Sequence, residues 1–216
     1  MAPVRTDPAR TDPARADLVA PRRGYAKGRA RREEILDAAT TLFGEVGYRS
    51  ASLREIAQRV GISHPGLLHH FGGKEQLLAA VLAHRDERDD HRFGLSGARG
   101  RGALRALVEL VADNARHPGI VELYCVLSAE ATSPEHPAHR YFRDRYARTV
   151  AAVARHFAEI AAEGGLRPGV DPRAAAVRVV ALMDGLQVQW LLDRTCVDMA
   201  AEVRAHLDGL LVEPLG

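Results

Sequence analysis

The amino-acid sequence predicts an all-α fold, in which an N-terminal three-helix helix-turn-helix domain precedes a larger helical bundle. Apolar side chains recur every three or four residues along most of the chain, and no segment has the period of two that a half-buried strand requires. Aromatic residues make up 5% of the sequence and hydrophobic residues 46%, a balance typical of helices rich in Ala and Leu. The third observation is a pair of short helices joined by a glycine-containing turn within residues 52–71.

Charge and cysteine content narrow the class of protein. Basic residues are in excess before residue 76 and acidic residues after it, although the net charge of the chain is only +2. A basic front on an acidic body suits a nucleic-acid-binding head on a soluble body. Cys125 and Cys196 lack metal-like spacing, and no run reaches the roughly 18 apolar residues of a membrane span. We therefore expect a cytoplasmic protein with reduced thiols, no signal peptide and no membrane partner.

Residues 1–28 are expected to be a disordered basic tail. The motif Thr-Asp-Pro-Ala-Arg occurs at 6–10 and again at 11–15, and proline and charge without apolar periodicity cannot form a core. The basic stretch at its end is either an arm that adds phosphate or minor-groove contacts to DNA or a solvated tail. Arg31 and Arg32 are favoured as contacts because they adjoin the folded domain.

A first domain at residues 29–83 is expected to start with a long amphipathic helix. Its apolar residues recur with helical spacing over 35–46, and Gly47 ends the run. A second, short helix follows Ser52, which forms a capping box with Glu55: the serine caps the helix and the glutamate reaches back.

The next two helices are also marked by their ends. Gly61 suits the left-handed turn after the second helix, and Ser63 caps a third helix with Pro65 in its first turn. A fourth helix begins near Lys74 and is expected to fade in the polar, Gly-containing segment 84–100, where we place the domain boundary.

The second domain, residues 84–216, shows helical periodicity only. Asp171 and Asp198 are expected helix N-caps, and Pro172 follows at a first helical position. We expect helices at about 101–116, 119–131, 138–163, 173–192 and 198–210.

The two short helices have the plan of a DNA-binding helix-turn-helix. In that geometry the second helix enters the major groove by its N-terminal end, where this chain would expose His64, Pro65 and Gly66. The same arrangement also occurs as a plain packing unit, but the flanking amphipathic helices favour DNA binding.

Residues 30–83 resemble the N-terminal domain of the tetracycline-repressor (TetR) family. The resemblance rests on the order and spacing of Ile35-Leu36-Asp37-Ala38-Ala39, Leu42-Phe43, Gly47-Tyr48, Leu53-Arg54-Glu55-Ile56-Ala57, Gly61-Ile62-Ser63, His69-His70-Phe71 and Lys74-Glu75-Gln76-Leu77-Leu78. It implies an all-α homodimer that binds double-stranded operator DNA and carries a variable ligand-binding C-terminal domain, with repression as the default. Residues 171–211 resemble the last two helices of that family more loosely.

The resemblance also implies roles for single residues. Ser52 would contact a phosphate as well as cap its helix, and Arg54 would contact a base or a phosphate. The positions that read bases would be held by His64, Pro65 and Gly66, and those that grip phosphates by His70 and Lys74, with His69 as a neighbouring candidate. Ser63 is assigned to the same DNA-binding surface. Two departures affect this surface: Leu68 stands where the family usually has a DNA-contacting Tyr, and Gly66 where many members have Thr.

Two alternatives to DNA contacts concern these residues. Arg54 is then a solvated surface charge, or the histidines bind a metal ion. Adjacent His69 and His70 project to different faces of a helix, and His136 and His139 have no Cys or acidic cluster at ligand spacing, so we expect no metal.

The segment 173–192 is apolar nearly all round and must be buried on two sides. One side would be its own core and the other a second subunit, so that this helix and the last one build a four-helix dimer interface. The residues assigned to that interface are Val180, Asp184, Gly185, Val188, Met199, Val203 and Leu207.

A small-molecule effector site is expected in the second domain, which has enough helices to enclose one. Its candidate residues are Asn114, His117, Tyr124, Cys125, Tyr141, Phe142, Met183 and Gln187. Two other functions compete with a ligand-responsive regulator: an architectural DNA-binding protein without an effector, and an all-α enzyme. The sequence has no Gly-x-Ser-x-Gly, phosphate loop or His-Glu-x-x-His, so we expect no catalytic site and no cofactor.

Overall fold

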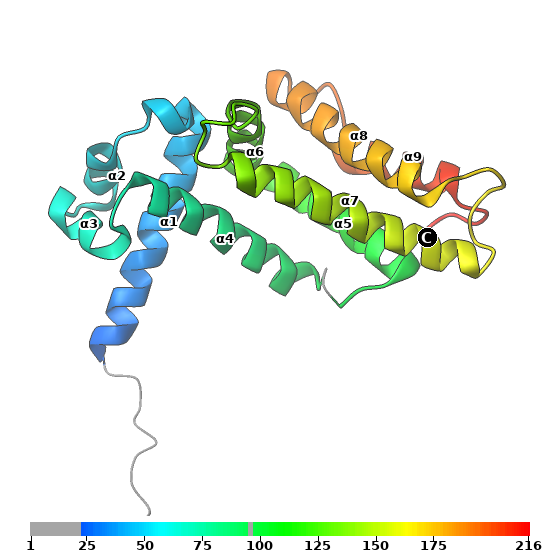
Figure 1. Cartoon of the computed structure of the whole chain (residues 1–216), viewed down its shortest axis with the longest axis horizontal. Coiled ribbons are helices and arrows are strands. Elements are labelled where there is room, and N and C mark those ends of the chain that lie inside the picture. Colours follow the sequence, from blue (N-terminus) through cyan, green and yellow to red (C-terminus); the bar gives the residue numbers. More distant parts are fainter. Residues whose placement is uncertain (1–22, 95–96) are drawn as a thin grey trace, which may run out of the picture.

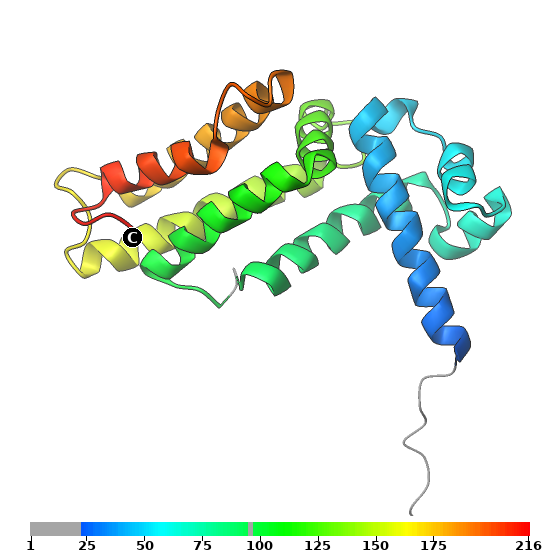
Figure 2. The ribbon, with the colours of Figure 1, turned by 180° about the vertical axis from the view of Figure 1, so that it is seen from behind.

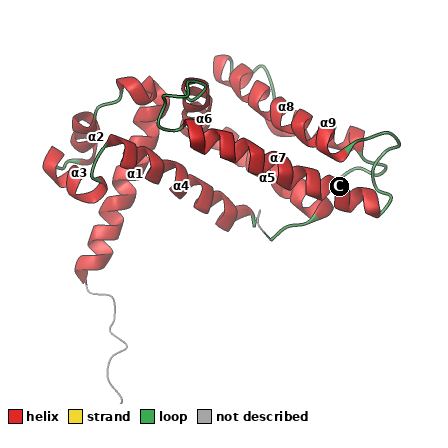
Figure 3. Cartoon of the chain, in the orientation of Figure 1, coloured by secondary structure: helices red, strands yellow, loops and turns green. Residues whose placement is uncertain are grey.

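The computed structural model describes residues 23–94 and 97–216, and these contain nine α-helices and no strand (Figure 3). The predicted all-α class is therefore confirmed. The first three helices, called the head from here on, are α1 (Arg23–Ser50), α2 (Leu53–Val60) and α3 (His64–Phe71). The other helices are α4 (Lys74–Phe93), α5 (Gly100–Arg116), α6 (Pro118–Glu130), α7 (His139–Ala162), α8 (Pro172–Leu192) and α9 (Met199–Leu210).

The head lies at one end of an elongated molecule and the body, α5 to α9, at the other (Figure 1). α4 leaves the head and runs beside the body, while α8 and α9 form the outer layer on the opposite side (Figures 1 and 2). Helix α1 packs against α6, which makes a second connection between head and body besides α4.

Helix α1 begins earlier than the sequence predicted, and its first regular part ends at Gly47 as predicted, where a kink separates it from a short helical segment that runs to Ser50. It starts at Arg23, so the last residues of the expected tail are helical; residues 1–22 lie outside the described part of the chain. Residues 27–30 are exposed, so packing does not explain why they are helical. Ala, Lys and Arg are good helix formers, and they extend a helix that the buried residues after them have already nucleated. Gly47, at φ 77° and ψ 168°, kinks the helix at the position where the sequence predicted its end.

The fourth helix ends inside the predicted segment 84–100, at Phe93 with Gly94 as its C-cap, ten residues beyond the predicted domain boundary. Two polar residues of that segment are buried: Arg85 forms an ion pair with Asp89 one turn later at 2.9 Å. Arg85 Nη2 also donates to Asn114 Oδ1 at 2.6 Å, which ties α4 to α5. The predicted domain division between 83 and 84 thus falls inside one continuous helix, and it stays a prediction.

Two apolar cores hold the fold together. The first is built from α1 to α4 and also includes Leu123 and Leu127 of α6 and Phe142 of α7. The second joins α5 through α9 around Phe157, which is fully buried. Because the head core contains body residues, the two regions are packed as one structure.

The close contact between α1 and α6 depends on a glycine. A Cβ on Gly44 would lie 3.1 Å from the backbone N of Leu123 and 3.2 Å from the carbonyl O of Gly119. One turn later, Tyr48 N donates to Glu130 Oε2 at 2.8 Å, beside the Gly47 kink. The C-terminal end of α6 is therefore bonded directly to the head.

Candidate DNA-binding surface and ligand cavity

The helix-turn-helix is defined by caps that are local in sequence. Ser52 Oγ accepts a hydrogen bond from Arg54 N at 3.2 Å, and Ser63 Oγ accepts one from Gly66 N at 3.1 Å. Gly61 has φ 70° and ψ 37°, the left-handed conformation that the turn requires. The predicted reach of Glu55 back to the helix start is not observed, because its carboxylate pairs with Arg59 at 3.1 Å.

One face of this unit is packed and the other is free. Ile56 and Ala57 of α2 and Leu67 and Phe71 of α3 are buried in the head core. The opposite face exposes Ser52, Arg54, Ser63, Pro65 and His69, with His64, Gly66 and His70 half-buried among them.

Arg54 is the cation on this face with the most freedom. It is exposed, and within the described part of the chain its guanidinium takes part in no hydrogen bond or ion pair. A neighbouring cation, Arg59, differs because it bridges Glu45 at 2.7 Å and Glu55. Arg54 can therefore bind an external phosphate or base edge without breaking a contact of its own.

The structure brings Arg31 and Arg32 next to the helix-turn-helix. Arg31 Nη1 donates to Val60 O at 3.1 Å and pairs with Glu34 at 2.6 Å, while the Arg32 guanidinium lies over the Phe71 ring, 4.9 Å from its centroid. Both side chains thus border the exposed face of α2 and α3, and Arg32 has the more exposed position.

Lys74, at the start of α4, is held by the head. Its Nζ donates to Arg49 O at 3.1 Å and lies 4.5 Å from the centroid of the Tyr48 ring. Partial burial lowers the pKa of Lys74, an effect that the charge of Glu130 opposes. The rings of His69 and His70 are 6.0 Å apart, and no group of three or more His, Cys, Asp or Glu in the described residues is arranged to hold a metal ion.

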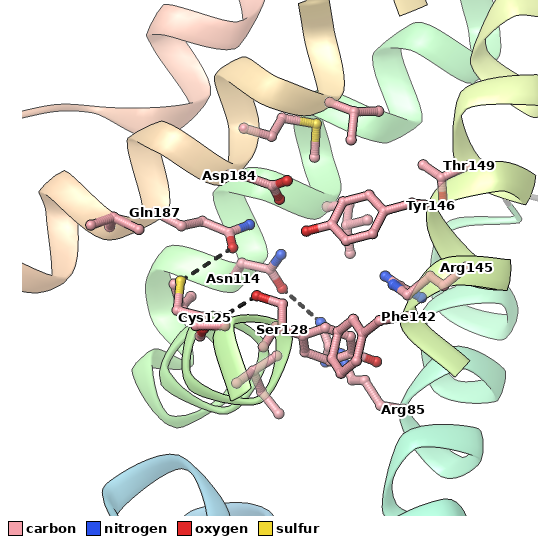
Figure 4. A pocket seen from close by; sticks show the side chains of 18 of the residues that line it. Arg85, Asn114, Cys125, Ser128, Phe142, Arg145, Tyr146, Thr149, Asp184 and Gln187 are labelled. Atoms are coloured by element: carbon pink, nitrogen blue, oxygen red, sulfur yellow. Dashed lines mark hydrogen bonds between the residues drawn. The ribbon is translucent and has the colours of Figure 1, made fainter. Parts of the chain in front are cut away.

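A cavity of about 390 Å³ lies inside the body, between α4, α5, α6, α7 and α8 (Figure 4). Six of the predicted effector residues line it, contributed by α5, α6, α7 and α8: Asn114, Tyr124, Cys125, Phe142, Met183 and Gln187. Two others do not. His117 faces a separate groove, and Tyr141 donates its hydroxyl to Asp86 Oδ2 at 2.9 Å outside the cavity wall.

The cavity also has polar residues that sequence reasoning missed or placed elsewhere. Arg85 and Asp89 belong to the segment of α4 in which the sequence predicted the helix to fade, and Arg145 and Tyr146 project from α7 (Figure 4). Asp184, Val180 and Val188, all assigned to the dimer interface, line the cavity, and Val188 is also exposed at its edge. The one signal that pointed to Arg85 and Asp89 is their spacing of four, which allows an ion pair inside a helix.

Most charges in the cavity wall are compensated within the chain. Arg85 is paired with Asp89, and burial raises the pKa of the Asp89 carboxyl to about 6 even though Arg85 and Arg145 attract its charged form. Arg145 forms an ion pair with Asp86 and lies 4.7 Å over the Tyr124 ring. The aromatic and aliphatic part of the wall is therefore edged by two salt bridges.

Asp184 differs because its partner is neutral. Burial raises the pKa of its carboxyl, and a hydrogen-bonding interaction with the Tyr146 hydroxyl opposes that rise. Burial also raises the pKa of Cys125 to about 11, with a contribution from Asp184, so the thiol stays protonated at neutral pH. Cys125 Sγ lies 3.7 Å from Gln187 Oε1, close to the same part of the wall (Figure 4).

The residues assigned to a dimer interface need correction. Met199, Val203 and Leu207 are 2%, 0% and 0% exposed within a single chain, so they belong to the protomer core. The apolar pattern of α9 identifies a buried face but not what covers it. The face that packs inside the same chain was therefore assigned to the interface. Gly185 and Val188 are exposed as expected.

An apolar stripe nevertheless remains on the outside of α8. Val177, Val188 and Leu192 are 48%, 50% and 84% exposed, with Ala181 and Gly185 between them on the same face. We call these five residues the α8 stripe. On α9, Ala201, Ala205 and Gly209 are exposed at four-residue spacing, which allows close helix approach.

Helix α8 is also long and apolar enough, by length and composition alone, to cross a membrane. Its inner face packs in the body core through Val179, Leu186 and Trp190, and this single helix of the described residues is weak support for a span. Only 33% of its apolar window is buried in one chain, which fits a helix covered by a second subunit.

Two protein-family models match the chain. The model of bacterial regulatory proteins of the tetR family matches residues 35–81, and the model of the C-terminal part of BetI-type transcriptional repressors matches residues 100–212. The matches fall on the head with the start of α4 and on the body.

Individual relatives agree with the family models. The chain is 28% identical over 200 residues to the HTH-type transcriptional regulator TtgR of Pseudomonas putida, covering 87% of this chain and 92% of the relative. It is 43% identical over 84 residues to the HTH-type transcriptional repressor KstR2 of Rhodococcus jostii, a match that spans 36% of this chain and 40% of the relative.

Solved structures share the fold. A TetR-family transcriptional regulator from Rhodococcus sp. superposes with a TM-score of 0.69 at 25% identity, covering 85% of this chain and 99% of the other. A transcriptional regulator from Saccharomonospora viridis, solved in complex with choline, gives a TM-score of 0.70 over 86% of this chain and 99% of the other. At 22% identity the second likeness shows the fold alone.

Proposed function

The chain belongs to the TetR family of bacterial regulatory proteins and is a ligand-responsive DNA-binding regulator, and we propose that it represses transcription as a homodimer that a small molecule releases from operator DNA. The observation that carries this proposal is the presence, in one chain, of a helix-turn-helix with a free Arg54 and of an internal cavity of about 390 Å³. A cavity of this size fits a small organic molecule.

Operator recognition is assigned to the exposed face of α2 and α3. The first turn of α3, with His64, Pro65 and Gly66, would enter the major groove, and Arg54 would contact a base edge or a phosphate from α2. Phosphate contacts would come from Ser52, Ser63, His69, His70 and Lys74, with Arg31 and Arg32 at the edge. Lys74 would exchange its bond to Arg49 O for one to a phosphate.

The homodimer is assigned to the α8 stripe and to the small residues of α9. Exposed apolar side chains around Gly185 favour close approach of two helices, and a two-fold axis would pair the surface with itself. The dimer places two α3 helices in successive major grooves when they are roughly 34–36 Å apart.

Release would follow from a change in that separation. A ligand shifts the equilibrium only if it binds one conformer better than the other, and displacing a well-occupied operator requires several kcal/mol of differential affinity. Helix α4 carries cavity residues Arg85 and Asp89 and begins beside α3, so a shift in it moves the recognition helix. Helix α6 offers a second path, since Ser128 lines the cavity and Glu130 bonds to the head.

An architectural DNA-binding protein without an effector is the weaker alternative, because it leaves the cavity and its buried ion pairs without a role. The family and the structural neighbours are transcriptional regulators, so we propose no catalytic function. Members of the family are soluble cytoplasmic proteins, and we propose the same place of action for this chain.

The proposal is tested by first mapping bound sites with genome-wide footprinting and then titrating the purified protein against the operator found. Saturable binding by a dimer at nanomolar protein, lost on addition of a compound that also protects the protein from thermal unfolding, is expected. Binding that no stabilising compound releases would contradict the sensor role and leave DNA binding intact.

A further inference from the structure

A second cavity, of about 370 Å³, lies where the head meets the body. We call it the junction groove. It is bordered by Asp37, Thr40 and Thr41 of α1, by Arg85, Arg88 and Arg92 of α4, and by the segment from Asp113 to Ile120 that links α5 to α6. The proposed operator and effector sites make no use of this groove apart from Arg85 and Ile120, which it shares with the ligand cavity.

The groove carries more positive than negative side chains. Four arginines line it, against the carboxylates of Asp37 and Asp113. Asp113 is 1% exposed and is shared: Arg92 contacts both its oxygens at 2.8 and 3.0 Å, and Arg116 contacts one at 2.9 Å. One carboxylate therefore faces two guanidinium groups, and these have further N–H donors directed away from it.

The remaining side chains of the junction groove do not neutralise its excess of positive charge. Arg88 reaches Asp37 only at 3.7 Å, and both side chains are exposed. Arg85 is 8% exposed and bonded to Asp89 and Asn114, yet its buried Nε has no hydrogen-bond partner in the described chain.

The N-terminus of α6 adds to the positive potential. Pro118 occupies the first position of this 13-residue helix, and Gly119 follows in the groove wall. The N–H of Gly119 has no acceptor in the described residues, and a Cβ at this glycine would meet no atom within 4 Å. Open space thus lies beside a helix end that favours negative charge.

We propose that the junction groove binds a small anion through a carboxylate or phosphate group and is a second regulatory site. Arg88 and Arg92 would bind it from α4, Arg116 from α5, and the Gly119 amide from α6. Charge-assisted bonds of this kind are among the strong ones in proteins, and guanidinium groups suit both anions. An anion held there would tie α4 to the α5–α6 link and restrict the movement through which the effector acts.

The experiment measures binding of inorganic phosphate and of citrate to the full chain without DNA, by calorimetry at fixed pH and with chloride adjusted to constant ionic strength. We expect saturable binding of at least one of them. The double variant Arg88→Gln/Arg116→Gln, which leaves Arg92 on Asp113, should weaken that binding at least tenfold while circular dichroism stays unchanged. A preference for phosphate indicates a phosphorylated ligand, and a preference for citrate indicates a carboxylate.

Two controls separate the groove from other cationic surfaces. Arg155→Gln removes one positive charge from an exposed position on α7 without a partner in the described chain, and Arg54→Gln removes one from the exposed face of α2, so the two together match the charge that the double variant removes. Both should bind the anion within twofold of the unaltered protein. The proposal is overturned if neither anion saturates, if the double variant binds normally, or if Arg54→Gln causes the loss. Because no DNA is present, none of these outcomes bears on the proposed repression.

Discussion

The head and the body use their polar residues in opposite ways. On α2 and α3 the polar side chains lie outside an apolar core, and Arg54 has no partner in the described chain. Around the body cavity, Arg85 and Asp89 of α4 and Arg145 of α7 lie in the wall and are paired with one another or with Asp86. Arg54 therefore stays available to an external partner, whereas the charges of the cavity wall are mostly satisfied within the chain.

This difference predicts whether a substitution changes DNA binding or the stability of the fold. Removing a free surface cation costs the fold little and costs binding directly. Removing half of a buried pair leaves an uncompensated charge and costs the fold first. Four substitutions test the comparison, in order of decreasing expected effect.

Arg85→Ala should have the largest effect, lowering the free energy of unfolding by about 3–5 kcal/mol because Asp89 loses its partner in a buried site. Chemical denaturation measures it. The matched control is Arg85→Met/Asp89→Leu, which removes both charges and should stay near the stability of the unaltered protein. A control as unstable as the single variant would contradict the account of a buried pair.

The same variant has a predictable pH dependence. The pKa of Asp89 is about 6 in the folded chain, above its ordinary value of 3.8, so protonation favours the folded state and stability is lost as pH rises through 6. Without Arg85 the ionised carboxylate is disfavoured further. The deficit of Arg85→Ala should therefore be larger at pH 8 than at pH 5, and an equal deficit at both would count against it.

Val188→Asp should weaken dimerisation about 100-fold, since it places a charge in the apolar α8 stripe, where no cation of that stripe can pair with it. Sedimentation at micromolar concentration would show a monomer with unchanged helix content. Ala151→Asp, at an exposed position in the middle of α7, serves as the control and should remain dimeric. A dimeric Val188→Asp protein would place the interface elsewhere.

Arg54→Ala should lower operator affinity by about 1–2 kcal/mol, roughly tenfold, without changing the stability of the fold. If Arg54 binds a phosphate, the slope of log affinity against log salt should fall by about 1. Arg155→Ala, the loss of an equally exposed arginine on α7, should leave operator binding as it is. Equal affinities of Arg54→Ala and the unaltered chain would remove α2 from the recognition surface.

Glu130→Gln should have the smallest effect, because it weakens the bond to Tyr48 N and the contact with His136 Nε2 at 3.5 Å without removing the acceptor. We expect a loss of about 1 kcal/mol in the free energy of unfolding. Glu87→Gln, an exposed residue of α4, should lose nothing measurable. This test bears on the comparison of head and body because Glu130 lies in the body and its carboxylate accepts a hydrogen bond from Tyr48 of the head.

The contrast between the head and the body also explains which parts of the structure could be predicted from the sequence. Ser52, Gly61 and Ser63 specify the turn of the helix-turn-helix through neighbours within a few residues, so the head was predicted nearly helix by helix. The body depends on partners far apart in the chain. The sequence analysis did not single out Arg85, because nothing local shows that Asn114, 29 positions later, accepts its hydrogen bond.

The outer helices α8 and α9 show a second reason why parts of the structure could not be predicted from the sequence. Asp184 interrupts an apolar segment, and its spacing fits a subunit interface and a cavity wall equally well; packing against α6 and α7 decides for the cavity. Met199, Val203 and Leu207 are apolar on the face of α9 that turns inward. Periodicity identifies a buried face but does not say whether the cover is the same chain or a second copy.

The central claim is that the body cavity and the head surface are two sites of one coupled equilibrium. A compound found by its protection against thermal unfolding is titrated into the free dimer and into the dimer saturated with operator, at one salt concentration. The account predicts that operator weakens compound binding by the same factor by which the compound weakens operator binding, since coupling is reciprocal. Equal compound affinities with and without operator would contradict it.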